Sequence, residues 1–375
     1  MEKRAYGMST SGENRLARHS EFLEQLNGWE VTSDCNSHRQ DRPELRDCSL
    51  IIPTYSRPKE VVALLEHIAA NDSSDLPGEL VIVDGSPNDA TEQDLKEWVN
   101  GASLRFTLKY VHSRPGLTRQ KNVGIDISSG NYLFFLDDDT LPLPGYFREM
   151  RAIFSCDEER KIGAIGGSIS NEMNRPVSFR WRVRMALHLV PRTEPMRYDA
   201  AGISLPKALA KPFSGTREVD IVPGGASCFR REVFSTSRFS MFFDGYSNGE
   251  DVEMSLRVGT RFRLLWSGDA QLTHNHAPGG RPPSFSRGRM DVRNRLFIRR
   301  RFWPKPPLKA SIRFWADVLL LVVLDLVVFC RRPHDTFLVQ HAAGLVWASV
   351  EAMLAPPLFE EPPARREYVL RGVTS

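Results

Sequence analysis

The chain has 375 residues, of which 41% are hydrophobic, so it can bury a sizeable core. Its formal net charge is only +4, and because no recognised nucleic-acid module accompanies the basic residues, we expect no nucleic-acid partner. The five cysteines are odd in number and show no C-x-x-C spacing, which favours neither a disulfide framework nor a zinc site and fits a reducing cytosol.

Residues 1–45 form a polar N-terminal extension that lacks the apolar core of a signal peptide, and we expect a short helix around residues 16–26. Beyond it, short apolar strands alternate with helical segments. Val61, Leu64, Leu65 and Ile68 follow the spacing of a helix with one buried face. This alternation predicts an α/β fold, with a mostly parallel, Rossmann-like sheet covered by helices on both faces. Strands are expected at residues 49–55, 80–83, 106–111 and 132–136.

Three consecutive aspartates, Asp137, Asp138 and Asp139, directly follow the apolar strand at 132–136. A strand there delivers its carboxylates to the carboxyl edge of the sheet, where open α/β sheets bind ligands. Adjacent carboxylates repel one another, and a hard divalent cation such as Mg²⁺ or Mn²⁺ would remove that repulsion while bridging to a diphosphate. The alternative is an acidic, solvated strand end. Asp84 also ends a strand, so the fold should bring it to the same edge.

Six segments together resemble the inverting family 2 glycosyltransferases of the GT-A fold, in the family's order and roughly its spacing. They are SLIIPTY (49–55), VDGS (83–86), RQKNVG (119–124), FLDDD (135–139), PGGASCFRR (223–231) and GEDVE (249–253). The resemblance implies a GT-A domain over residues 46–290 that moves a sugar from a nucleotide-diphosphate sugar to a hydroxyl of a carbohydrate or lipid-linked acceptor. The alternative is a non-catalytic nucleotide-sugar-binding protein, which would be expected to have lost Asp251 or the Asp137/Asp139 pair.

The resemblance also implies a donor site. Asp137 and Asp139 match the metal-binding pair, with Asp139 as the more direct ligand, whereas Asp138 is an indirect metal contact, a ribose contact or a structural residue. Asp84 matches the aspartate that binds the nucleotide base, and its alternative is a turn residue that caps the next helix. The further donor candidates are Pro53, Thr54, Tyr55 and Arg57 on the adjacent loop, with Arg119 and Lys121, which otherwise lie on a solvated helix face.

Asp251 matches the family's catalytic base, and Glu250, which precedes it, is a candidate contact of the acceptor or the sugar. We expect a helix to begin here, and a helix N-terminus favours the ionised carboxylate that a general base needs. Simple helix capping is the alternative. Gly224 and Gly225 would let backbone amides approach the acceptor or the donor sugar, or would form an ordinary tight turn.

A histidine is expected to complete the metal site, because the segment around His274 resembles the family segment that supplies one. His274 directly ends a strand-like run and is preferred over His276, although a lone histidine is more often structural. Imidazole suits Mn²⁺ better than Mg²⁺. The loop over residues 278–288 is rich in Gly, Pro and Arg and could form a flap over the donor phosphates.

The C-terminal region, residues 291–375, is expected to be basic and helical. Nine Lys and Arg residues stand between positions 289 and 313 beside Asp291, and an apolar stretch follows at 318–329. As a helix it would span roughly 18 Å, well short of the roughly 30 Å hydrocarbon core. We interpret the region as an anchor on an anionic membrane surface, which places the protein peripherally on the cytoplasmic face. The alternative is a helical subdomain with a solvated basic face. The sequence indicates no oligomeric state.

Overall fold

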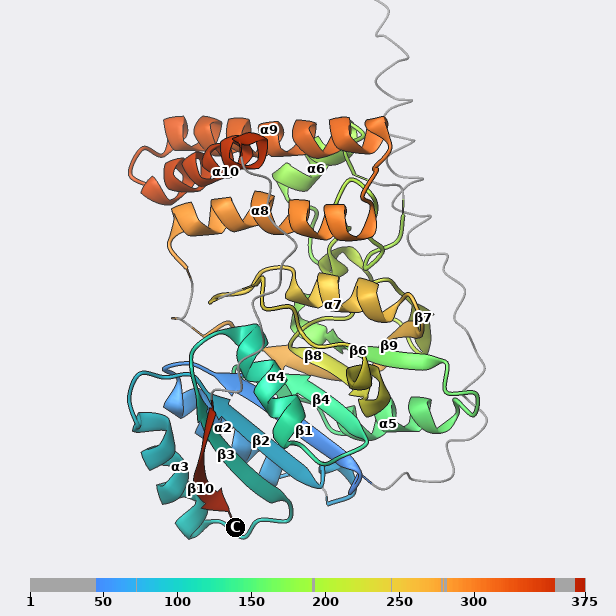
Figure 1. Ribbon diagram of the computed structural model, residues 1–375, viewed down its shortest axis with the longest axis vertical. Coiled ribbons are helices and arrows are strands. Elements are labelled where there is room, and N and C mark those ends of the chain that lie inside the picture. The colour runs from blue at the N-terminus through green and yellow to red at the C-terminus, as the bar shows by residue number, and fades with distance from the viewer. Residues whose placement is uncertain are drawn as a thin grey trace, which may run out of the picture.

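The computed structural model describes residues 45–374 apart from Asp72, 191–192, Asp244, Pro278, 280–281 and 355–367. The helix expected around residues 16–26 therefore lies outside the described residues. The described chain has two tiers, a sheet with its covering helices and a layer of long helices that includes α8, α9 and α10 (Figure 1).

The first half of the sheet is the parallel unit that the apolar runs predict. It consists of β1 (Cys48–Thr54), β2 (Glu79–Asp84), β3 (Thr107–Ser113) and β4 (Tyr132–Leu136). β1 lies between β2 and β4, and β3 pairs with the outer side of β2, all in parallel. Parallel strands end at one edge, so the residues that follow β1 and β4 meet there.

The remaining strands extend the sheet mainly in antiparallel fashion. They are β5 (Thr140–Pro142), β6 (Ile162–Ile169), β7 (Thr216–Glu218), β8 (Ala226–Arg230), β9 (Arg263–His274) and β10 (Tyr368–Thr374). The order is β10-β3-β2-β1-β4-β8-β6-β9-β5, with β7 beside β9. β8 runs antiparallel to both β4 and β6. The predicted α/β architecture is confirmed, but the sheet is mixed. Among the described residues, parallel pairing occurs within the four strands above and between β6 and β9.

Helices cover both faces of the sheet, and successive residues of a strand point alternately toward the two faces. α2 (Pro58–Ala69), α3 (Ala90–Gly101) and α5 (Tyr146–Ser155) share one core with Phe134, whereas Phe135 joins the core on the other face. α2 begins with Pro58 at its first turn, where a missing N–H costs nothing, and buries the four apolar residues that the spacing predicts.

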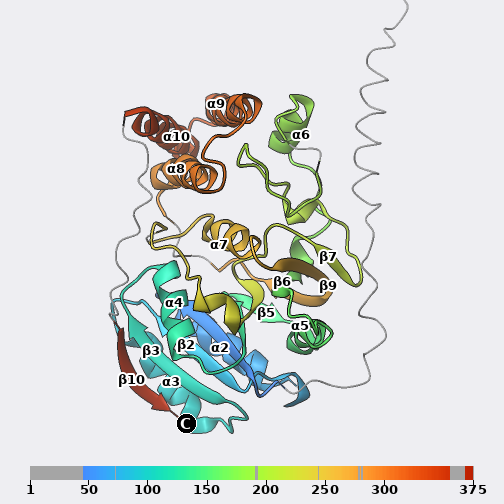
Figure 2. The same cartoon turned by 45° about the vertical axis from the view of Figure 1, so that its right-hand side comes forward.

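The second face is covered by α4 (Leu117–Ile127) and α7 (Glu250–Val258), which is the helix expected at Asp251. Figure 2 shows both helices between the sheet and the upper tier. Short 3-10 turns occur at Ser73–Asp75, Ser170–Glu172, Lys207–Leu209 and Arg231–Ser235.

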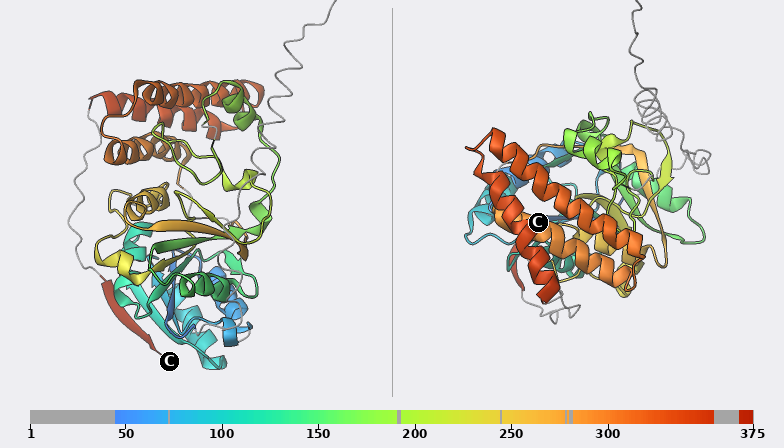
Figure 3. Two further views of the ribbon diagram at one scale, coloured as in Figure 1. Left: turned by 90° about the vertical axis from the view of Figure 1, so that its right-hand side faces the viewer. Right: turned by 90° about the horizontal axis from the view of Figure 1, so that it is seen from above.

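The upper tier is a helical layer of α8 (Ser284–Phe302), α9 (Leu308–Arg331) and α10 (Thr336–Leu354), flanked by α6 (Phe179–Ala186) (Figures 2 and 3). α8 and α10 approach closely, since a Cβ on Gly344 would lie 2.1 Å from the Phe285 carbonyl oxygen. The layer has its own core. Because α8 begins at Ser284, the domain boundary predicted at residue 290 falls inside a helix.

Several basic residues of the run 289–313 form ion pairs within the molecule. Arg295 pairs with the buried Asp317, and Arg313 pairs with Asp199. Arg289 and Arg301 also have carboxylate partners, Glu351 and Glu253. Carboxylates that are distant in sequence thus pair with four of the nine basic side chains of this run, and its contact with an anionic membrane surface stays a prediction. Among the described helices, α10 alone is long and apolar enough to cross a membrane, and 39% of its apolar window is buried.

Candidate active site

A cleft of about 1260 Å³ opens where β1 and β4 end. Its walls come from the loop after β1, the aspartate triplet after β4, the glycine pair before β8, the start of α7 and the end of β9. The predicted residues that line it are Pro53, Thr54, Tyr55, Arg57, Asp137, Asp138, Asp139, Gly224, Gly225, Glu250, Asp251 and His274.

Arg57 and His274 connect the aspartate triplet to the surrounding loops. Asp138 accepts hydrogen bonds from the Thr54 hydroxyl at 2.7 Å and from Arg57 Nη1 at 2.8 Å. Asp139 Oδ2 accepts from Arg57 Nη1 at 3.3 Å and from the Ala277 backbone N–H at 2.9 Å. Its other oxygen, Oδ1, lies 3.2 Å from His274 Nε2. The loop after β1 and the loop after β9 thus close on one acidic group.

Burial and crowding set the protonation of these carboxylates. Burial raises the pKa of Asp137 and raises that of Asp138 to about 6. Burial also acts on Asp139, but the hydrogen bond from His274, with the charges of His274 and Arg57, outweighs it and lowers that pKa. The hydrogen bonds to Asp139 and Glu172 raise the pKa of His274 to about 9. The cluster of three aspartates would therefore be stabilised by a bound cation.

The donor set fits one divalent ion. One ligand atom each from Asp137, Asp139 and His274 lie within 4.8 Å of one another. Two carboxylates and one imidazole are ligands that Mn²⁺ accepts, and Mg²⁺ also accepts the carboxylates.

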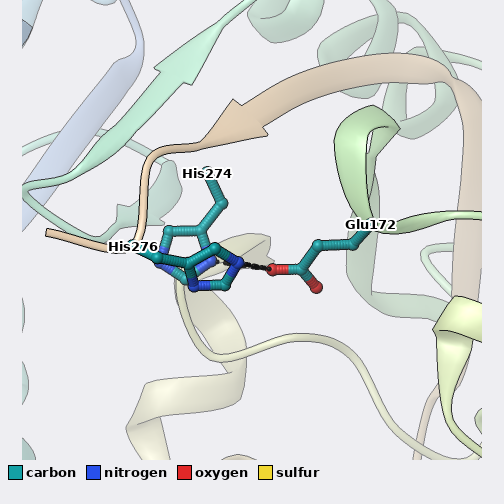
Figure 4. A group of neighbouring side chains, drawn as sticks. All are labelled: Glu172, His274 and His276. Carbon is teal, nitrogen blue, oxygen red and sulfur yellow. Dashed lines mark hydrogen bonds and ion pairs between the residues drawn. The ribbon is translucent and has the colours of Figure 1, made fainter. Parts of the chain in front are cut away.

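A further acidic residue, Glu172, points toward both His274 and His276 (Figure 4). Its Oε1 is 2.9 Å from His274 Nδ1 and 3.1 Å from His276 Nε2. Its Oε2 is 3.3 Å from Lys207 Nζ. Glu172, His274 and His276 form another group with ligand atoms within 4.8 Å. His274 belongs to both groups and presents a different ring nitrogen to each.

Asp251 stands in the first turn of α7, directly after Glu250. Gly249, at φ 92°, begins the helix in the left-handed region that glycine favours. Asp251 Oδ1 accepts from its neighbour's N–H, Val252, at 2.8 Å. Glu250 is buried and pairs with Lys121 at 3.1 Å. Burial, followed by the Glu250 charge, raises the pKa of Asp251 to about 6. Asp251 thus remains a proton acceptor at neutral pH and faces the cleft.

The glycine pair separates the metal-fitting group from Asp251. A Cβ on Gly225 would lie 2.1 Å from Asp137 Oδ2. A Cβ on Gly224 would lie 3.1 Å from Glu250 Oε1 and 3.2 Å from the Asp251 Cβ. Only glycine at 225 lets the chain pass this close to Asp137, so the pair brings both sets of carboxylates to one wall.

Three predicted donor residues are not among those that line the cleft. Asp84 is fully buried at the end of β2, where it accepts from the Ser86 N–H at 2.8 Å and the Tyr110 hydroxyl at 2.9 Å. The Ser86 contact makes Asp84 a turn residue, as its alternative states, but the cap of the next helix, α3, is Asp89 rather than Asp84. Lys121 is held by Glu250, and Arg119 is half-buried on α4. Their nucleotide and phosphate roles stay predictions.

Sequence reasoning missed several residues of the cleft. Gln120 donates to the Thr54 and Val83 carbonyls at 2.7 and 2.8 Å and so ties the ends of β1 and β2 together. It lies within the RQKNVG segment, so attention to helix phase would have selected it over its two basic neighbours. Glu172, Lys207 and Tyr246 come from irregular segments that carry no motif.

Comparison with known proteins agrees with this geometry. A model of glycosyl transferase family 2 matches residues 49–237. An uncharacterized glycosyltransferase of Haemophilus influenzae is 33% identical over 96 residues, which are 26% of this chain and 30% of that protein. A poly(ribitol-phosphate) beta-N-acetylglucosaminyltransferase of Staphylococcus aureus is 30% identical over 91 residues, which are 24% of this chain and 16% of that one. The matches thus span less than a third of these relatives.

Among solved structures, a mannosyltransferase from Pyrobaculum calidifontis, in complex with GDP-Man and Mn²⁺, superposes with a TM-score of 0.51 at 17% identity. The match covers 91% of this chain and 94% of that one. At that identity the likeness concerns the fold, and it agrees with the predicted GT-A architecture. Since the family model covers half of the chain, the chain belongs to glycosyl transferase family 2.

Proposed function

We propose that this chain transfers a sugar from a nucleotide-diphosphate sugar to an acceptor hydroxyl, with inversion at the anomeric carbon. The observation that carries the proposal is that Asp251 and the group of Asp137, Asp139 and His274 line the same cleft. A transferase of this kind needs a site for the departing diphosphate and a proton acceptor for the attacking hydroxyl. The cleft offers both, on either side of the glycine pair.

The donor would lie along the loop after β1. Tyr55 is 44% exposed in the cleft and offers a ring on which a base can stack, and Pro53, Thr54 and Arg57 line the same wall. A bound divalent ion, Mn²⁺ or Mg²⁺, would be held by Asp137, Asp139 and His274 and would supply positive charge to the diphosphate. The Mn²⁺ and GDP-Man named with the P. calidifontis mannosyltransferase support this assignment.

The reaction needs one base and no covalent enzyme intermediate. Asp251 accepts the proton of the acceptor hydroxyl while that oxygen bonds to the anomeric carbon and the bond to the diphosphate breaks. Attack from the side opposite the leaving group inverts the anomeric configuration. Because Lys121 holds Glu250, Asp251 is left as the acceptor of that proton.

We also propose that the acceptor is a carbohydrate or a lipid-linked molecule and that the protein works in the cytoplasm, peripherally on the membrane. The poly(ribitol-phosphate) acceptor in the name of the S. aureus relative supports a glycan-type acceptor. The four cysteines of the described chain are free, which suits a reducing compartment.

A panel of nucleoside diphosphate sugars tests the catalytic proposal. Each sugar is added with Mn²⁺ to the full chain, and thermal shift selects the donor. Anomeric proton NMR of the transfer product should then show the configuration opposite to that of the donor. Retention would overturn the single displacement. Tight donor binding without transfer to any glycan or lipid-linked acceptor would instead favour the non-catalytic alternative.

A further inference from the structure

The outer faces of α9 and α10 form an unusually apolar surface. Twelve of the seventeen exposed large hydrophobic residues in the described chain lie on these two helices. They recur at helical spacing, with Leu319, Val323 and Leu326 on α9 and Val346, Val350 and Met353 on α10. Both helices lie across the outside of the upper tier (Figure 3). We call this surface the outer apolar face. A soluble monomer rarely leaves so much apolar area in water.

The two aspartates of α9 lie on the opposite, buried side of the helix. Asp317 is fully buried and pairs with Arg184 at 2.8 Å and Arg295 at 2.9 Å. Asp325, also fully buried, pairs with Arg180 and with His341 Nδ1, the latter at 2.6 Å. These contacts reach α6, α8 and α10. Each helix is therefore divided into an ion-paired inner side and an aliphatic outer side.

We propose that the outer apolar face lies in the interfacial region of a lipid bilayer and holds the enzyme on the membrane surface. Of the three acidic residues on the two helices, Asp317 and Asp325 are buried, and the partly exposed Glu351 is paired with Arg289. Exposed cations, Lys305 and Lys309 before and at the start of α9 and Arg331 and Arg332 at its end, suit lipid headgroups. The face is rich in Leu, Val and Ile, whereas protein interfaces favour aromatic residues and Arg.

The arrangement corresponds to a helix layer that lies on the membrane rather than one that crosses it. Crossing would require α10 to leave α8, although Gly344 allows backbone contact there and His341 pairs with Asp291 of α8 at 3.1 Å. An interfacial helix buries its apolar side roughly 5–10 Å deep while its polar side keeps its partners. Binding should therefore depend on apolar contact and should resist salt. This inference concerns location and stands independently of the catalytic base.

Vesicle flotation of the full chain tests the proposal, with phosphatidylcholine vesicles that contain phosphatidylglycerol, at low salt and in 1 M NaCl. The parental chain should float at both salt concentrations. The double variant Leu319→Glu/Val323→Glu should lose vesicle binding by more than about tenfold. The control Gln93→Glu/Asn100→Asp adds the same charge to exposed positions of α3, at the opposite end of the molecule, and should bind like the parent.

Circular dichroism of both double variants serves as the control for folding. Equal binding by the Leu319→Glu/Val323→Glu variant would overturn the proposal, and so would release of the parent by salt alone. A parental chain that ignores vesicles but forms a dimer, while the glutamate variant is a monomer, would assign the face to a second copy of this chain and also overturn it.

A separate observation concerns Glu172 and rests on the proposed metal site. His274 presents Nε2 to Asp139 and Nδ1 to Glu172, at 3.2 and 2.9 Å. A histidine that binds a metal through one nitrogen commonly donates its other N–H to a carboxylate, which fixes the tautomer and the ring. Lys207 in turn holds the free oxygen of Glu172. Glu172 is thus anchored on the side away from the aspartates.

We propose that Glu172 is a positioning residue that orients His274 toward an ion shared with Asp137 and Asp139. The alternative location for the ion is the group of Glu172, His274 and His276. His276 discriminates between the two, because it contacts Glu172 Oε1 but does not belong to the aspartate group (Figure 4). It therefore provides a matched control.

Mn²⁺ binding to the purified chain, measured by electron paramagnetic resonance without substrate, tests this assignment. Glu172→Gln should raise the Mn²⁺ dissociation constant by about 10- to 100-fold, whereas His276→Gln should leave it nearly unchanged. Unchanged binding by Glu172→Gln would overturn the positioning role alone. A loss in His276→Gln as large as in His274→Gln would move the ion to the other group. No Mn²⁺ binding by the parent would overturn the metal site itself.

Discussion

The cleft and the helical layer both bury aspartates, but they satisfy them differently. In the layer, Asp317 meets two arginines, and Asp325 meets an arginine and a histidine. In the cleft, Asp137, Asp138 and Asp139 stand side by side, and Arg57 bridges only two of them. Asp251 has another carboxylate as its neighbour.

The difference separates structural from functional charge. A buried aspartate with one or two cations at hydrogen-bond distance keeps its charge and holds helices together. Asp137 and Asp251 stand beside other carboxylates at a cavity, and burial together with those neighbouring charges raises their pKa values, which is a costly arrangement that a ligand can relieve. We therefore expect substitutions in the cleft to lower turnover more than stability, and substitutions in the helical layer to lower stability more than turnover.

The largest effect is expected in the cleft. Asp139→Ala should lower turnover by at least about 10³-fold, because positive charge on the leaving diphosphate stabilises the transition state by several kcal/mol. Removing Asp139 relieves repulsion within the triplet but also removes its contacts with Arg57 and His274, so turnover is compared per folded molecule. Turnover is measured in excess Mn²⁺, and stability by the unfolding midpoint in urea. Near-parental turnover would remove Asp139 from the metal site.

The reverse pattern is expected in the helical layer. Asp317→Leu leaves the half-buried Arg184 and Arg295 without this partner, which should lower the free energy of unfolding by about 3–5 kcal/mol. Turnover per folded molecule should stay near the parental value, because α9 belongs to the upper tier and none of its residues lines the cleft. A stable Asp317→Leu protein, or a folded one without activity, would contradict the division between the two regions.

A smaller effect concerns the pH dependence of transfer. The pKa of Asp251 is raised to about 6, so the base is protonated below that pH, and kcat/KM should fall about tenfold per pH unit there and level off above it. The Glu250 charge raises this pKa and the Lys121 charge lowers it. Glu250→Gln should therefore move the acidic limb to lower pH, and a limb that stays in place would show that another group titrates.

The parts of the fold that could be predicted from sequence are those with local signals. β1, β2 and β4 are apolar runs, β3 is a mixed segment that directly follows Phe106, and α2 has an amphipathic spacing. β6 was missed because its GAIGGSI sequence holds three glycines and little strand propensity, and it is held instead by β8 and β9 on its two sides. Strands of that kind depend on partners that are distant in sequence.

The candidate site shows the same limit. Motif order places Asp139, Asp251 and His274, and the structure brings all three to one cleft. Asp84 is not among the residues of the cleft, because the Ser86 N–H and the Tyr110 hydroxyl hold its carboxylate inside the fold. A sequence motif does not reveal those two donors. Glu172 lies in a short turn, where nothing in the local sequence indicates that it meets His274.

If Asp251 is the base and the aspartate triplet binds the donor, one variant should separate catalysis from donor binding. Asp251→Asn keeps the size of the side chain and removes the proton acceptor. Measured on the same folded sample, turnover should fall by about 10²- to 10⁴-fold while the affinity for the nucleotide-sugar donor with Mn²⁺ stays near the parental value. Transfer at nearly the parental rate, or loss of donor binding instead of turnover, would contradict the account.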